Sequence, residues 1–171
     1  EYAMKFQNDT FKIINDSFNN IEKYFKEESI DGIIYDLGTC STHLDQPERG
    51  FSFNKDGPLD MRFNNKKGTP LSVWLENASE EQIRDILYKF GDEKHAKLIS
   101  NAIVRSKIKN KITTTTQLSN IIKDIHPEKN KKIHPATKSF QAFRIFINNE
   151  LEEFAESLKA AEKLLKLGGY I

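Results

Sequence analysis

The stretch of residues 30–62 constrains the fold more than any other part of the chain. Its first apolar run is too short for a helix and rich in β-branched residues, so it predicts a buried strand over residues 32–35. The run ends at Asp36, and a turn follows at Gly38. Open α/β sheets bind ligands at the carboxyl ends of their strands. Asp36 is therefore expected to lie at a binding site.

The rest of this stretch predicts a structured loop or a domain junction. Prolines and glycines alternate there with charged and aromatic side chains, in the order Pro47, Arg49, Gly50, Phe51, Phe53, Gly57, Pro58, Asp60 and Arg62. A flexible linker would lack the aromatic residues, whereas functional loops on a rigid scaffold commonly combine these residue types.

Composition limits the class of protein. A chain of 171 residues with 37% apolar and 30% charged content fits one globular domain, or one domain with an insertion. No apolar stretch approaches the ~20 residues of a membrane span, and the amino end lacks the pattern of a signal peptide, so we expect a cytoplasmic protein. Cys40 is the only cysteine, which excludes an internal disulfide.

Basic residues are concentrated in one segment. The net charge is +1, yet residues 105–138 contain nine lysines or arginines and only two acidic residues. Such asymmetry indicates a polyanionic partner more strongly than the total charge does.

The first part of the chain predicts a strand at residues 11–15, an amphipathic helix at 17–28 and the strand at 32–35. Helices follow the loop. Ser79 and Gln82 have the spacing of a capping box, and the helix that they start should end at Gly91. Asp92 is expected to cap the next helix, and Thr114 or Thr115 the one after it.

One long helix is predicted to close the chain. With Pro135 in its first turn, apolar residues recur every three or four positions from Phe140 to Leu165, as far as Gly168. About thirty residues would form a rod of ~45 Å. The last residues, LGGYI at 167–171, are expected to start a new apolar strand.

Two long strings, DLGTCSTHLDQPERGFSFNKDGPLDMR at 36–62 and HPATKSFQAFRIFINNELEE at 134–153, closely resemble the RsmH (MraW) family of S-adenosylmethionine-dependent methyltransferases. That family methylates N4 of a cytosine in small-subunit ribosomal RNA. The resemblance implies an α/β fold: part of a class I, Rossmann-like methyltransferase core at 1–47, an inserted all-α domain at 48–140, and a return helix with the next core strand at 141–171. It also implies an internal fragment that lacks the family's cofactor loop and its carboxyl end.

The resemblance assigns roles to single residues. It places Phe18 against the adenine of S-adenosylmethionine and gives Asp36 a cofactor contact, with a catalytic role left open. His43 stands where the family usually has Gln, which is also a cofactor contact. The residues alone leave other interpretations: Phe18 as a core residue, and Asp36 as a turn-capping residue.

Cys40 and His43 suggest a second chemistry, because a thiol beside an imidazole can act as a nucleophile and its base. Methylation of an amine needs no covalent intermediate, so this interpretation is disfavoured. No metal site is expected, since the four histidines lack ligand spacing.

Lysines and one histidine form the predicted RNA-binding face: Lys129, Lys131, Lys132, His134 and Lys138, with Lys107, Lys109 and Lys111. A solvated surface is the alternative. We expect small-subunit ribosomal RNA or the ribosomal subunit as partner, with no membrane or DNA partner. A non-catalytic RNA-binding or ribosome-assembly module is the alternative function.

Overall fold

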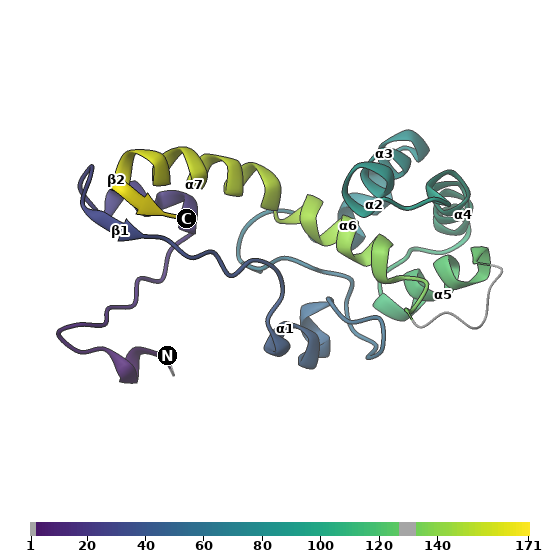
Figure 1. Ribbon diagram of the computed structural model, residues 1–171. Helices are drawn as coiled ribbons and strands as arrows, with labels where there is room; N and C mark the ends of the chain where they lie inside the picture. The colour runs from purple at the N-terminus through teal and green to yellow at the C-terminus, as the bar shows by residue number, and fades with distance from the viewer. Residues whose placement is uncertain (1–2, 127–132) are drawn as a thin grey trace. The chain divides into compact units, whose positions relative to one another are not determined.

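The computed structural model describes residues 3–126 and 133–171, as a mixed helix and sheet structure (Figure 1). Its elements are the 3₁₀ helix Ala3–Phe6, the 3₁₀ helix Phe18–Lys23, β1 (Ile30–Gly32), α1 (Ser41–Asp45), the 3₁₀ helix Pro47–Arg49, α2 (Leu71–Asn77), α3 (Glu80–Gly91), α4 (Ala96–Lys109), α5 (Thr115–Ile125), α6 (Thr137–Ile147), α7 (Glu150–Leu164) and β2 (Leu165–Tyr170).

The chain forms two compact units. We name Glu1–Asp36 together with Leu151–Ile171 the sheet unit, and Leu37–Glu150 the helical unit. In the sheet unit, β1 and β2 pair in parallel, with Ile30 opposite Leu165 and Gly32 opposite Tyr170. A parallel pair needs a long connection between its strands. Here everything from Ile33 to Leu164 provides it.

Two predictions for the amino-terminal part of the sheet unit are wrong. Residues 11–15 form no strand, because Phe11 exchanges backbone hydrogen bonds with Asn8 in a local turn rather than with a neighbouring strand. The predicted helix at 17–28 is reduced to one short 3₁₀ helix. The Asp16 carboxylate, which accepts hydrogen bonds from Ser17, Asn20 and Tyr24, favours this local turn over a continuous α-helix.

The predicted strand at 32–35 also differs. β1 starts earlier, at Ile30, and ends at Gly32, and the last inter-strand bond runs from the Ile33 amide to the Tyr170 carbonyl. Asp36 therefore lies in irregular backbone beyond the strand rather than directly at its end.

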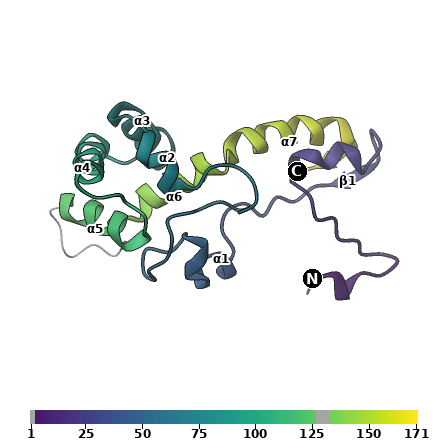
Figure 2. The same ribbon diagram turned by 180° about the vertical axis from the view of Figure 1, so that it is seen from behind.

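The helical unit is built around α3 and α6, which pack against each other, while α4 packs on α3 and α5 on α4. Figures 1 and 2, which view the molecule from opposite sides, show α3, α4 and α5 gathered near α6. These helices share one core with α2 and with the loop before it. The largest fully buried side chains of this core are Leu59, Met61, Leu71, Leu75, Ile83, Leu87, Ile99, Ile103, Leu118, Ile122 and Phe143.

Two of the predicted helix starts are confirmed. Ser79 and Gln82 form a reciprocal capping box at α3, and Thr114 forms one with Gln117 at α5. The prediction for Asp92 is wrong. It adopts a left-handed conformation (φ 45°) that ends α3, and α4 starts only after His95. Short polar side chains tolerate this conformation, so Asp92 can terminate a helix as well as begin one.

The single long helix is also wrong. α6 ends at Ile147 and α7 begins at Glu150. Between them Asn149 has a left-handed φ of 51°, and the Asn148 side chain donates a hydrogen bond to the Arg144 carbonyl. Two asparagines thus stop a helix that the apolar spacing alone would continue. Across residues 3–126 and 133–171, no helix has the length and apolar character needed to cross a membrane.

The capping box of α3 generates a stability prediction. In Ser79→Ala, the Gln82 amide loses its side-chain acceptor, and we expect the free energy of unfolding to fall by about 1 kcal/mol in urea denaturation. Ser106→Ala is the control, because Ser106 lies inside α4 and alanine has a higher helix propensity. Equal stabilities for the two variants would contradict the assignment.

Candidate functional site

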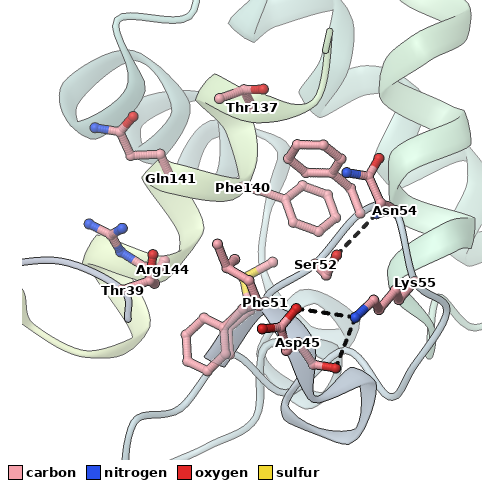
Figure 3. Close-up of a pocket in the computed structure, with 13 residues that line it drawn as sticks. Thr39, Asp45, Phe51, Ser52, Asn54, Lys55, Thr137, Phe140, Gln141 and Arg144 are labelled. Carbon is pink, nitrogen blue, oxygen red and sulfur yellow. Dashed lines mark hydrogen bonds and ion pairs between the residues drawn. The ribbon is translucent and has the colours of Figure 1, made fainter. Parts of the chain in front are cut away.

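A cavity of about 430 Å³ opens within the helical unit, between the segment from Thr39 to Met61 and α6 (Figure 3). This volume lies in the ~300–1,000 Å³ range of small-molecule sites. The lining side chains are Thr39, Leu44, Asp45, Phe51, Ser52, Phe53, Asn54, Lys55, Met61, Thr137, Phe140, Gln141 and Arg144.

One wall is a face of α6. Thr137, Phe140, Gln141 and Arg144 follow one another at helical spacing, so one apolar ring is flanked by three polar side chains. The guanidinium of Arg144 is held by Glu150, with Nε 2.7 Å from Oε1 and Nη2 3.0 Å from Oε2. This paired geometry fixes the arginine at the edge of the cavity.

The opposite wall is the loop that follows the 3₁₀ helix Pro47–Arg49. Phe53 packs edge-on against Phe140 of α6, at 5.4 Å between ring centroids. Ser52 accepts a hydrogen bond from the Asn54 amide, and the Lys55 ammonium is bound by Asp45 (Figure 3). Flat rings and hydrogen-bonding groups thus share the same cavity.

The segment from Asp60 to Phe63 contains the lining residue Met61 and forms the floor of the cavity. Two arginines fix this segment. Arg62 makes a paired ion contact with Asp60, at 2.6 and 2.8 Å, and Arg49 donates to the carbonyls of Arg62 and Phe63. Burial raises the pKa of Asp60, but hydrogen bonds from Arg62 outweigh it, so the pKa lies below its usual value. Asp60 is therefore ionised at neutral pH.

His43 lies beside this cavity without lining it. Its ring stacks on Phe63 and lies against Phe51, with centroids 5.2 and 5.1 Å away. Burial lowers the pKa of His43 below its ordinary value, and the positive charge of Arg49 lowers it further. His43 is accordingly neutral near pH 7, with one ring nitrogen as a donor and the other as an acceptor.

The structure brings Cys40 to His43, with Sγ 3.4 Å from Nδ1 and 2.8 Å from the Thr42 hydroxyl. The hydrogen bond with Thr42 lowers the pKa of the exposed Cys40 thiol, and a backbone bond from His43 adds to this. Neither Cys40 nor His43 lines the cavity, so the contact alone does not make a nucleophile for a ligand bound there. Within the residues described, no three His, Cys, Asp or Glu side chains are grouped as metal ligands.

Phe18 and Asp36 belong to the sheet unit. Phe18 is 39% exposed and packs edge-on against Tyr35, whose hydroxyl donates to the Ser157 carbonyl of α7. Asp36 is exposed. Both side chains are therefore accessible to a ligand.

The residues of the predicted RNA face have varied surroundings. Lys129, Lys131 and Lys132 lie outside the described residues. The His134 ring stacks on Phe53 at 4.4 Å, and burial lowers its pKa. Lys138 donates to the carbonyl and the carboxylate of Asp92.

Two further lysines have partners inside the helical unit. Lys107 donates to the carbonyls of Leu75, Glu76 and Ala78, at the carboxyl end of α2. Lys111 pairs with Glu76 at 2.6 Å.

The cavity contains residues that the sequence reasoning missed, among them Thr137, Gln141 and Arg144. A signal was available, since these three follow one another at helical spacing beside the apolar face of a predicted helix. Ser52 and Asn54 carried no comparable signal, because loop residues lack periodicity.

The sequence also matches a known protein family. The profile of the MraW methylase family matches residues 1–171. The chain is 46% identical over 171 residues to the ribosomal RNA small subunit methyltransferase H of Buchnera aphidicola subsp. Acyrthosiphon pisum (strain Tuc7). The aligned region covers 98% of the chain and 55% of the relative.

Two other relatives carry the same name. The protein of Acinetobacter baumannii (strain SDF) is 45% identical over 98% of the chain and 54% of its own length. That of Coxiella burnetii (strain Dugway 5J108-111) is 42% identical over 96% of the chain and 55% of its own length. The chain thus spans about half the length of these curated relatives.

The environment of His43 generates a pH prediction. The unfolded chain binds this proton with the ordinary pKa of 6.5, and the folded chain binds it less tightly. The stability contributed by neutral His43 is therefore complete above pH 6.5, and it is lost as the pH falls from 6.5 through the lower folded pKa.

We expect the His43 ring proton resonances in NMR to titrate with a midpoint below 6.5. His43→Gln should lose this part of the pH dependence of stability, because glutamine does not titrate. A midpoint at or above 6.5 would contradict the buried, neutral assignment.

Proposed function

Because the chain belongs to the MraW methylase family, we propose that the whole protein transfers a methyl group from S-adenosylmethionine to N4 of a cytosine in small-subunit ribosomal RNA. One observation carries this proposal. Relatives named ribosomal RNA small subunit methyltransferase H are 42–46% identical over almost all of the chain. The cavity in the helical unit supports it, because its size suits a small ligand such as one base.

The exocyclic amine of cytosine is a poor nucleophile, since its lone pair is delocalised into the ring. An enzyme must hold the splayed-out base in a fixed orientation, with hydrogen-bond acceptors of the protein facing the N–H groups of the amine. The cavity lining contains both kinds of group: the largely buried rings of Phe51 and Phe140, and the hydrogen-bonding atoms of Ser52 and Gln141. We propose that these residues orient the target base.

Three residues suit S-adenosylmethionine by their chemistry. That molecule supplies a methyl group on a positively charged sulfonium, and it carries a flat adenine. The exposed Asp36 carboxylate complements positive charge, and the partly exposed Phe18 ring offers an apolar face. His43, neutral near pH 7, can donate or accept a hydrogen bond as the family's Gln does. We propose all three as cofactor-binding residues and Asp36 also as a catalytic residue.

We further propose the division into a core part at 1–47, an inserted all-α domain at 48–140 and a return to the core at 141–171. Helices α2 to α6 share one buried core, which supports a self-contained helical region. The helical unit seen in the structure is wider than this domain, because it includes residues from 37 to 150.

The partner in this proposal is small-subunit ribosomal RNA or the ribosomal subunit, encountered in the cytoplasm. The excess of basic residues over 105–138 supports an RNA contact. Lys129, Lys131, Lys132, His134 and Lys138 remain the proposed contact residues. If the whole protein binds RNA without methylating it, the alternative function, a non-catalytic RNA-binding module, replaces this proposal.

The role of Asp36 is testable in the whole protein. We expect Asp36→Ala to lose methyl transfer to small-subunit RNA while keeping its fold, because an exposed carboxylate beyond the strand contributes little to packing. Methyl incorporation and circular dichroism are measured on the same preparation. Asp31→Ala is the matched control, since Asp31 is an exposed carboxylate of β1 that pairs with Lys166. Wild-type activity in Asp36→Ala would overturn the assignment.

The lysines at positions 129, 131 and 132 give a second test. Changing Lys129, Lys131 and Lys132 together to Ala should weaken RNA binding and flatten its salt dependence, since each lost phosphate contact removes ~0.7 to 0.9 from the log-log slope. A triple change of Lys12, Lys23 and Lys26 to Ala removes the same charge from the sheet unit and should leave the slope closer to wild type. If both triple variants behave alike, only net charge matters, and Lys129, Lys131 and Lys132 have no specific role.

A further inference from the structure

Asn148, at the end of α6, is bonded to a distant loop. Its Nδ2 donates to the Met61 carbonyl at 2.7 Å and to the Arg144 carbonyl at 2.9 Å. Its Oδ1 accepts from the Phe63 amide at 2.6 Å. The side chain thus satisfies the last turn of its own helix and two backbone groups of a segment 85 residues earlier in the chain.

The two loop residues that Asn148 holds are part of the cavity and of its support. Met61 lines the cavity, is 1% exposed and has a left-handed φ of 64°, a conformation that costs energy in a residue other than glycine. The Phe63 ring stacks on His43 and on Phe51, which lines the opposite wall. The strained segment is therefore connected to both walls.

Only an asparagine meets these demands at this position. The site needs a donor for two carbonyls and an acceptor for one amide on a short side chain. An aspartate would accept from Phe63 but would place a negative charge against the Met61 carbonyl. An alanine would remove the side-chain hydrogen-bond partner of both the Met61 carbonyl and the Phe63 amide. Arg49 holds the carbonyls of Arg62 and Phe63, so it does not replace either bond made to the loop by Asn148.

We propose that Asn148 is a positioning residue for methyl transfer: its amide locks the segment from Met61 to Phe63 to the carboxyl end of α6 and so sets the spacing between the floor and the α6 wall of the cavity. Arg144 and Gln141 of the same helix are part of that wall (Figure 3). The inference rests on the proposed function, because it assumes that this cavity holds the target base.

The test uses the whole protein and isolated small ribosomal subunits. Asn148→Asp, nearly identical in shape, and Asn148→Ala should each lower kcat by roughly 10- to 100-fold, because small misplacements of a reacting group are costly. KM for the ribosomal subunit should stay near wild type, since phosphate contacts supply most of that affinity. Hydrogen exchange of the Phe63 amide should accelerate in Asn148→Ala.

Two control variants separate positioning from stability. Asn77→Ala removes an equivalent bond at the end of α2, from Asn77 Nδ2 to the Val73 carbonyl, without any loop contact, and it should retain kcat. Ile103→Val weakens the buried core away from the cavity and shows how far kcat falls from destabilisation alone.

A loss of kcat in Asn148→Asp no greater than in Ile103→Val at equal thermal destabilisation would overturn the inference while leaving the proposed function intact. An inactive wild-type protein would instead overturn the proposed function, and the positioning role with it.

Discussion

The cavity depends on a close approach between two parts of one loop. A side chain on Gly50 would collide with the Pro58 carbonyl and the Asp60 amide, and one on Gly57 would collide with the Pro47 carbonyl. The colliding atoms are backbone, so they have no rotamer by which to move away. Gly50 also has a left-handed φ of 73° at the end of a 3₁₀ helix. This crossing brings Phe51, which lines one wall, close to Met61, which forms the floor. Without these two glycines the loop would not close on itself.

The features that sequence reasoning predicted correctly are local. The capping box of Ser79 with Gln82 was predicted from its spacing, and the helix start at Thr114 or Thr115 from the residue type. Both caps involve residues only three positions apart, so a short pattern contains the required information. The break after Ile147 is different, because the apolar spacing continues through it. The asparagine at 148 stops the helix partly through its bonds with Met61 and Phe63, a contact between segments 85 residues apart. A pattern within one helix contains no information about such a partner.

The strand predicted at residues 11–15 illustrates the same limit. A β-branched, apolar run satisfies its backbone in a sheet only if a neighbouring strand is present, and Phe11 bonds to Asn8 instead. The cavity was likewise beyond reach, because Phe53 and Phe140 meet only after the loop has folded onto α6. The family resemblance supplied site residues by position, whereas the polar face of α6 could have been found from helical periodicity alone.

The basic residues of segment 105–138 have a different significance in the structure than in the sequence. Counted along the chain, Lys107, Lys111 and Lys138 add to the basic segment. In the structure Lys111 and Lys138 pair with Glu76 and Asp92, and Lys107 caps the carboxyl end of α2. Burial lowers the pKa of Lys107, and that effect exceeds the raising influence of Glu76. A lysine that neutralises a helix end or a carboxylate must break that contact before it can bind a phosphate. It therefore contributes less than an unpaired lysine to the counterion release that drives RNA binding. Within the described part of this segment, Lys107, Lys111 and Lys138 therefore contribute less to the electrostatic attraction for RNA than their sequence charge indicates.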